Sequence, residues 1–143
     1  MANKDNPSIG KHFENTIWDY YKTQGIELNN QFGIPIGFPG KKRVHNFDLG
    51  ATNPAMIIEC KAHTWTEGGN VPCAKLSVWR QSMFYFSLTT KGYQKIFFVL
   101  KSIRNGETLA DYFIAKCAHL IPPDVEIWEY DVEEAMAVRK YYT

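Results

Sequence analysis

Five consecutive apolar residues at positions 96–100, IFFVL, lie between two lysines. A strand without polar side chains needs cover on both faces, so it favours a central place in a sheet that has helices on each side. The run is far shorter than the ~20 apolar residues of a membrane-spanning helix. The chain has 143 residues, of which 45% are hydrophobic and 22% charged, and this suits one domain with a buried core. We therefore predict an α/β fold.

The remaining periodic segments supply the other elements of that fold. Apolar residues at helical spacing predict helices over residues 8–24, 74–88, 107–120 and 132–141. Short alternating or apolar runs predict strands over residues 31–40, 44–50, 56–63, 95–101 and 125–130. Pro35 confines the first of these strands to an edge or a bulge. The prediction is one domain over residues 1–143, with the order α-β-β-β-α-β-α-β-α and a mixed central sheet flanked by helices.

Composition and motifs exclude several classes of protein. The three cysteines are an odd number at irregular spacing, which argues against a disulfide framework. Because no signal-like or membrane segment is visible, we expect a cytoplasmic protein without a membrane partner. The net charge of +1 gives no global basic signal, so a nucleic-acid partner must be argued from a local site. No nucleophile elbow, phosphate-binding loop or dinucleotide-binding glycine motif is present.

One group of charged residues falls on two neighbouring strands. Asp48 ends the strand at 44–50, and the sequence Glu59-Cys60-Lys61 lies in the strand at 56–63. Because side chains alternate along a strand, Glu59 and Lys61 share one face and Cys60 points to the other. The short turn at 51–55 places Asp48 approximately opposite Glu59. Repulsion between these two carboxylates raises the pKa of at least one of them, and Lys61 partly counters that effect.

Two carboxylates beside a lysine suit magnesium-dependent phosphodiester hydrolysis. Mg²⁺ takes one or two carboxylates, keeps several waters and accepts a substrate phosphate oxygen. The metal acidifies a bound water and offsets the charge that builds up in the transition state. An ammonium group beside it can orient and polarise the attacking water. We therefore assign Asp48, Glu59 and Lys61 as the candidate catalytic residues.

At these residues the sequence resembles the PD-(D/E)XK, or restriction-endonuclease-like, nuclease superfamily. Asp48 stands in the sequence HNFDLG, and ten residues separate it from Glu59 in the sequence ECK. Phe47 takes the place of the proline that names the motif. The resemblance implies a restriction-endonuclease-like αβββαβ core over residues 8–101. It also implies that Asp48 and Glu59 bind Mg²⁺ or Mn²⁺, with the Cys60 backbone carbonyl as a further ligand. Lys61 would then be the catalytic lysine.

Two further features of the resemblance concern supporting residues. Members of the superfamily often carry a glutamate on the first helix, and Glu14 matches it, with a role in supporting the metal ligands or binding a second metal. RecB-like members carry Gln-x-x-x-Tyr on the helix after the motif strand, and Gln81 and Tyr85 have that spacing. Residues four apart share one helix face, so both side chains can point toward the cleft.

Basic and aromatic residues near the motif are candidates for contact with DNA. Lys41, Lys42 and Arg43 form the densest basic run, and phosphate contacts there would position a nucleic acid without reading its sequence. Trp65, in the glycine-containing loop after the motif strand, could stack on bases. Lys75 and Arg80 could line the same cleft. The alternatives are a solvated turn for the basic run and an ordinary mobile loop for residues 64–72.

These patterns predict a divalent-metal-dependent endo- or exodeoxyribonuclease. The alternative function is a catalytically silent nucleic-acid-binding or assembly subunit of the same fold. The alternative for Asp48, Glu59 and Lys61 themselves is a salt-bridge cluster on a solvated strand face. Apolar residues surround the helix at 74–88, which leaves open a homodimer interface. A zinc site at Cys60, His63 and Cys73 lacks a fourth ligand at conventional spacing. The other histidines, among them His45, show no partner in the sequence. DNA and RNA are not distinguished as substrates by the sequence.

Overall fold

The computed structural model describes residues 7–141 of the chain. Its helices are α1 (Pro7–Thr23), α2 (Cys73–Ser87) and α3 (Leu109–Cys117), followed by the short 3-10 helix η1 (Ala118–Leu120). The strands are β1 (Asn29–Ile36), β2 (Arg43–Thr52), β3 (Ala55–Lys61), β4 (Gln94–Leu100), β5 (Ile103–Arg104), β6 (Glu107–Thr108), β7 (Val125–Asp131) and β8 (Met136–Arg139). From α1 to β4, the order of elements is the one that the sequence predicts.

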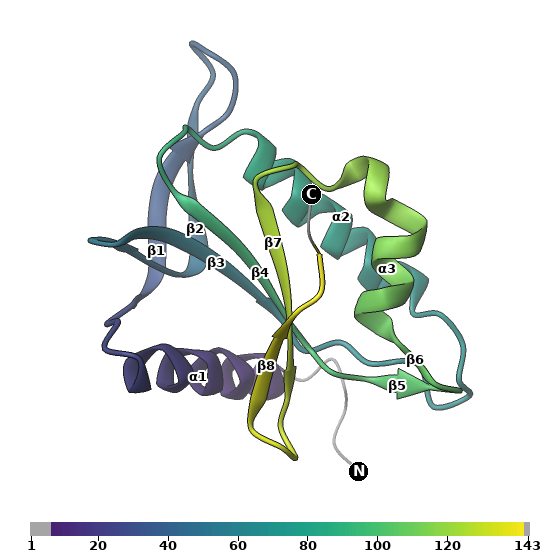
Figure 1. Ribbon diagram of the computed structural model, residues 1–143. Coiled ribbons are helices and arrows are strands. Elements are labelled where there is room, and N and C mark those ends of the chain that lie inside the picture. Colours follow the sequence, from purple (N-terminus) through teal and green to yellow (C-terminus); the bar gives the residue numbers. More distant parts are fainter. Residues whose placement is uncertain (1–6, 142–143) are drawn as a thin grey trace.

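The apolar segment at 96–100 lies in β4, inside a six-stranded sheet with the order β1-β2-β3-β4-β7-β8. β4 pairs in parallel with β3 and with β7, whereas the other neighbouring pairs are antiparallel. Figure 1 shows α1 on one face of the sheet and α2 and α3 on the other. Phe97 packs in the core cluster on the α2 and α3 side, and Phe98 packs in the cluster on the α1 side. The predicted central strand and mixed α/β fold are confirmed, and Pro35 lies in the edge strand β1.

The predicted helix at 132–141 is wrong, because this segment forms a hairpin that adds β8 to the edge of the sheet. The side chain of Asp131 accepts hydrogen bonds from the backbone N–H groups of Glu133 (3.0 Å) and Glu134 (3.2 Å). Such bonds offer the backbone a turn in place of a helix. Ala135 then takes a left-handed φ of 51°, which completes the reversal.

The predicted helix at 107–120 begins later than expected. Glu107 and Thr108 form β6, which pairs with β5 in a small separate hairpin. Thr108 is the N-cap of α3, and its side chain accepts a hydrogen bond of 3.1 Å from the backbone N–H of Asp111. Across residues 7–141, the chain forms no helix of the length and apolar character needed to cross a membrane.

Candidate active site at the end of the β2–β3 ladder

The alternation of side chains in β2 breaks at Asp48. Phe47 packs in the core cluster on the α2 side, whereas Leu49 packs in the cluster on the α1 side. In a regular strand, residues two apart point to the same face. The paired residues of β2 and β3 run only from Leu49 opposite Ile58 to Thr52 opposite Ala55. Asp48 therefore lies just beyond the end of the ladder, and the Glu59 carboxylate is near enough for its charge to act on Asp48.

Two features of the neighbouring backbone accommodate this break. Gln31 of β1 lies between the pairs Asn30–Leu49 and Phe32–Phe47, and it takes a left-handed φ of 53° that is uncommon for a non-glycine residue. A Cβ atom added at Gly50 would lie 2.6 Å from the ring of Phe32, so only glycine permits this close approach. The distortion is thus fixed by both strands.

The Asp48 carboxylate takes over the hydrogen bonding of the ladder where the strands separate. The backbone N–H of Cys60 donates to Asp48 Oδ2 at 2.8 Å. Burial is the largest cause that raises the pKa of Asp48 to about 7, followed by the negative charge of Glu59. The hydrogen bond from Cys60 and the charge of Lys61 act in the opposite direction. The sequence predicts a raised carboxyl pKa from repulsion alone, but burial contributes more.

Glu59 is the most buried acid of the group, with 4% of its surface exposed. Its Oε2 lies 3.8 Å from Lys61 Nζ, which agrees with the shared face predicted for these two residues. Its Oε1 lies 3.0 Å from His45 Nε2. Burial of Glu59 argues against a salt-bridge cluster on a solvated face, since the carboxylate has given up its water for these contacts.

His45 is a site residue that the sequence interpretation missed. It contacts Glu59, and its ring lies 4.2 Å from the ring of Tyr85 and 4.6 Å from that of Phe47, measured between centroids. Because the break at Asp48 changes which side chains of β2 face β3, simple strand alternation cannot bring His45 to Glu59. No pattern in the sequence indicates this contact.

Glu14 on α1 adds a third carboxylate to the same electrostatic group. Burial is the largest cause of its raised pKa, the charge of Glu59 raises the pKa further, and Lys11 and Lys61 lower it. Its Oε1 is buried and lacks a hydrogen-bond partner within the described part of the chain, although Lys11 Nζ lies 3.6 Å away. The ammonium group of Lys11 faces this oxygen as an ion pair, which partly offsets the cost of burying the carboxylate.

The residues of this site fit a divalent cation. Asp48 and Glu59 supply carboxylate oxygens whose charges act on each other, and carboxylate oxygens are the ligands that Mg²⁺ takes. Within residues 7–141, no three His, Cys, Asp or Glu side chains are arranged to hold one metal ion together. A cation would therefore be held by Asp48 and Glu59 with water completing its shell, which is the way proteins commonly bind Mg²⁺.

The two predicted supporting residues on α2, Gln81 and Tyr85, differ in whether they reach the site. Tyr85 is half-buried and stacks on His45, so it reaches the site through that ring. Gln81 is exposed, and no contact of its side chain is seen in the part of the chain that the structure describes. The apolar surround of α2 is also divided, because Leu76, Trp79, Met83 and Phe86 are buried while Val78 and Phe84 are exposed.

The predicted DNA-contacting residues lie in different surroundings. Lys41, Lys42 and Arg43 are exposed at the tip of the β1–β2 hairpin. Lys75 is half-buried in the first turn of α2. Arg80 is exposed on α2, where its Nη2 donates to Ser77 Oγ at 2.9 Å.

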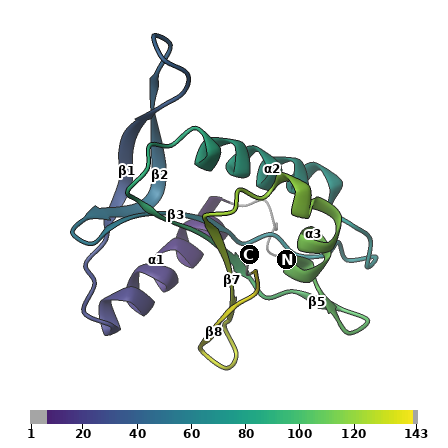
Figure 2. The ribbon, with the colours of Figure 1, turned by 45° about the horizontal axis from the view of Figure 1, so that its top comes forward.

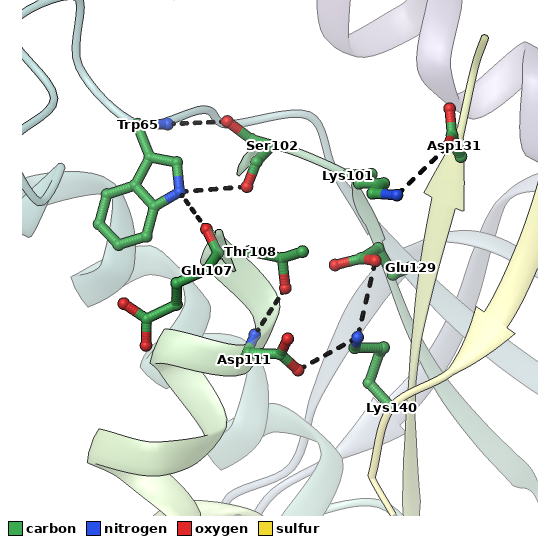
Figure 3. A network of polar contacts seen from close by, with 9 residues as sticks. All are labelled: Trp65, Lys101, Ser102, Glu107, Thr108, Asp111, Glu129, Asp131 and Lys140. Carbon is green, nitrogen blue, oxygen red and sulfur yellow. Dashed lines mark hydrogen bonds and ion pairs between the residues drawn. The ribbon is translucent and has the colours of Figure 1, made fainter. Parts of the chain in front are cut away.

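Only 4% of Trp65 is exposed, which argues against the prediction that this ring stacks on bases. Figure 3 shows its indole N–H donating to the backbone carbonyls of Ser102 (3.1 Å) and Glu107 (3.3 Å). Arg104 lies over the ring at 3.8 Å and donates to the Gly69 carbonyl. The apolar ring and its N–H both find partners inside the fold, so the loop at 64–72 is tied to the β5–β6 hairpin.

The same network joins the end of the sheet to the start of α3. Lys140 lies 3.2 Å from Asp111 and 3.8 Å from the buried Glu129, and Lys101 lies 3.4 Å from Asp131 (Figure 3). These contacts hold β7, the segment after β8 and α3 together.

The zinc alternative does not agree with the contacts of its three residues. His63 Nδ1 accepts a hydrogen bond of 2.8 Å from the indole N–H of Trp79. Cys60 is buried and Cys73 is exposed. Burial is the largest cause that raises the pKa of the Cys60 thiol well above its ordinary value. Among residues 7–141, no three His, Cys, Asp or Glu side chains are arranged to hold one metal ion.

No protein-family model, curated protein or solved structure matches the chain. The function is therefore argued from the site itself.

Proposed function

We propose that the chain is a divalent-metal-dependent nuclease that hydrolyses phosphodiester bonds of DNA, on a restriction-endonuclease-like core. The observation that carries this proposal is the buried Glu59, 3.8 Å from Lys61, whose charge acts on Asp48 from β2 and on Glu14 from α1. A fold seldom collects buried carboxylates in this way without a cation or a catalytic use for them.

Each residue of the site has a distinct role in this proposal. Asp48 and Glu59 hold Mg²⁺ or Mn²⁺, with the Cys60 backbone carbonyl as a further ligand. The bound cation supplies an acidified water and offsets negative charge on the phosphate. Lys61, whose side chain is 18% exposed, reaches the open side of Glu59 and orients the attacking water. Glu14 supports the metal ligands from α1.

His45 has a positioning role in the same proposal. It contacts Glu59 Oε1 at 3.0 Å, while Lys61 Nζ lies 3.8 Å from Oε2, so each oxygen of the carboxylate that would hold the metal has a partner within the chain. The ring of Tyr85 lies 4.2 Å from the imidazole ring at a tilt of 32°, so it would help to hold the ring against Glu59. Such indirect partners of a metal ligand set its orientation.

The test is cleavage of supercoiled, linear and branched DNA in Mg²⁺ or Mn²⁺, with a chelator control. We expect Lys61→Ala to reduce the rate by about 100-fold or more, as is typical when a transition-state charge partner is removed. Lys91→Ala is the matched control, because Lys91 is exposed in the turn before β4. Metal-dependent cleavage that continues at the wild-type rate in Lys61→Ala and Glu59→Gln contradicts the proposal. A wild-type chain that binds DNA without cutting any substrate favours the silent binding subunit.

A further inference from the structure

The β1–β2 hairpin extends beyond the rest of the sheet. Residues 43–47 of β2 pair with β1 but not with β3, so residues 32–47 form an arm that projects from the site (Figures 1 and 2). Building on the proposed nuclease function, we propose that this arm inserts Phe38 into duplex DNA where base stacking is interrupted. Lys41, Lys42 and Arg43 would hold the flanking phosphates.

The tip of the arm presents an apolar side chain to solvent in a fixed turn. Phe38 is 63% exposed, although a phenylalanine normally finds cover. It opens a β-turn in which Pro39 is followed by Gly40 with φ of 78°, and the Lys41 N–H donates to the Phe38 carbonyl at 3.0 Å. Proline then glycine at the two central positions is the preferred sequence of a type II turn. The turn therefore holds Phe38 outward at little entropic cost on binding.

One side of the arm is anchored to the fold as far as Gly37, next to Phe38. Ile34 and Ile36 are buried in the core cluster on the α2 side. The N–H of Gly37 also donates to the carbonyl of Leu88, just after α2, at 3.4 Å. The arm is thus braced on one side and exposed at its tip, as a wedge must be.

Charge on the arm selects a polyanion as the partner. Lys41, Lys42 and Arg43 are consecutive and exposed, and no anionic partner of theirs is seen among residues 7–141. No Asp or Glu occurs from residue 28 to residue 47, so the net charge of this stretch is +3. The net charge of the whole chain is +1, so the rest of the chain has a net charge of −2. Attraction for phosphates is therefore concentrated beside Phe38. Proteins that kink DNA combine such cations with an inserted apolar side chain.

The test measures binding in EDTA, so that it does not depend on cleavage. One probe is a nicked duplex with a fluorescent adenine analogue beside the nick, and the other is the continuous duplex of the same sequence. We expect wild type to prefer the nicked duplex and to raise the fluorescence as the base unstacks. Phe38→Ala should lose about tenfold in affinity for the nicked duplex, together with the fluorescence rise. The matched control is Phe84→Ala, since Phe84 is 55% exposed on α2.

Replacing Lys41, Lys42 and Arg43 with Gln tests the phosphate contacts separately. This variant should bind both duplexes more weakly and reduce the slope of log affinity against log salt by about 2 to 3. Equal binding of both duplexes by wild type, or an unchanged preference in Phe38→Ala, would overturn the proposal. Loss of the preference in Phe84→Ala to the same extent would overturn it too. Failure of the nuclease proposal would appear in the cleavage assay instead. The chain would then cut no DNA in Mg²⁺ or Mn²⁺ but would still prefer the nicked duplex.

Discussion

Asp48→Asn should stabilise the metal-free protein at neutral pH while it abolishes cleavage. The asparagine side chain keeps a carbonyl oxygen, so it can still accept the hydrogen bond that the Cys60 N–H donates at 2.8 Å. It removes a negative charge that burial and Glu59 both disfavour. If Asp48 is an active-site carboxylate, Asp48→Asn should therefore raise the free energy of unfolding. If Asp48 belongs to a structural salt bridge, the same substitution should lower it.

The size of the effect follows from the pKa of Asp48. This pKa is about 7 in the folded protein against 3.8 for an ordinary aspartate. One pKa unit corresponds to about 1.4 kcal/mol, so ionised Asp48 destabilises the fold by at most about 4 kcal/mol. Because the Asn amide is also partly desolvated, we expect a gain of about 2–4 kcal/mol in Asp48→Asn.

The pH dependence has a defined sign. The folded state holds the Asp48 proton more tightly than the unfolded chain does, so this contribution to stability is fully present below pH 3.8. It is lost as the pH rises from 3.8 to about 7. The stabilisation of Asp48→Asn relative to wild type should therefore be large at pH 8 and much smaller at pH 5.

Urea unfolding in EDTA at these two pH values measures the difference. With a slope of about 2 kcal/mol per molar urea, the midpoint of Asp48→Asn should exceed that of wild type by about 1 M or more at pH 8. A lower midpoint for Asp48→Asn at pH 8 would refute the reasoning, because it would show that the carboxylate stabilises the fold.

Three further expectations concern the break in β2 and the arm. Gln31→Gly should keep the free energy of unfolding or raise it by up to about 1 kcal/mol, because glycine adopts the left-handed φ of 53° without strain. Gln31→Val should lower the free energy of unfolding by about 1–2 kcal/mol, because a β-branched residue is strained at that φ. Urea unfolding distinguishes the two variants. His45→Ala should lower the free energy of unfolding by about 1–3 kcal/mol, since the buried Glu59 loses its partner, while the exposed His12→Ala should not. Five residue steps of β2, about 17 Å, separate the phosphate-binding Arg43 from Asp48, so cuts in a nicked duplex mapped on a sequencing gel should cluster at a fixed distance of at least about five nucleotides from the nick rather than spread evenly.

Local hydrophobic pattern predicts the central part of this fold well, because burial on both faces leaves little choice of residues. The run at 96–100 indicates a strand between two layers of helices, and Phe97 and Phe98 do face opposite layers. The nearness of Asp48 and Glu59, whose charges act on each other, could be predicted for a related reason. Only a two-residue turn separates β2 from β3, so the register has few alternatives.

Tertiary contacts decide the features that could not be predicted. Residues 132–141 have apolar spacing that suits a helix, but the free edge of β7 and the turn formed by Asp131 favour a strand. Trp65 lies in a glycine-containing segment that suggests an open loop. Its cover comes from Ser102 and Arg104, almost forty residues later in the chain. Neither partner can be identified from the segment itself.

The break in β2 links the chemistry of the site to its access. A regular β2 would continue pairing with β3 past Asp48, and the Cys60 N–H would then bond to backbone instead of to the carboxylate. The same irregularity ends the shared ladder at Leu49 and frees residues 43–47 to follow β1 away from the sheet. One local distortion thus accompanies both the Asp48–Cys60 hydrogen bond and the separation of the arm from β3. If both proposals hold, a single change that restores regular pairing should weaken the binding of Mn²⁺ and of nicked DNA together, as titration of each would measure.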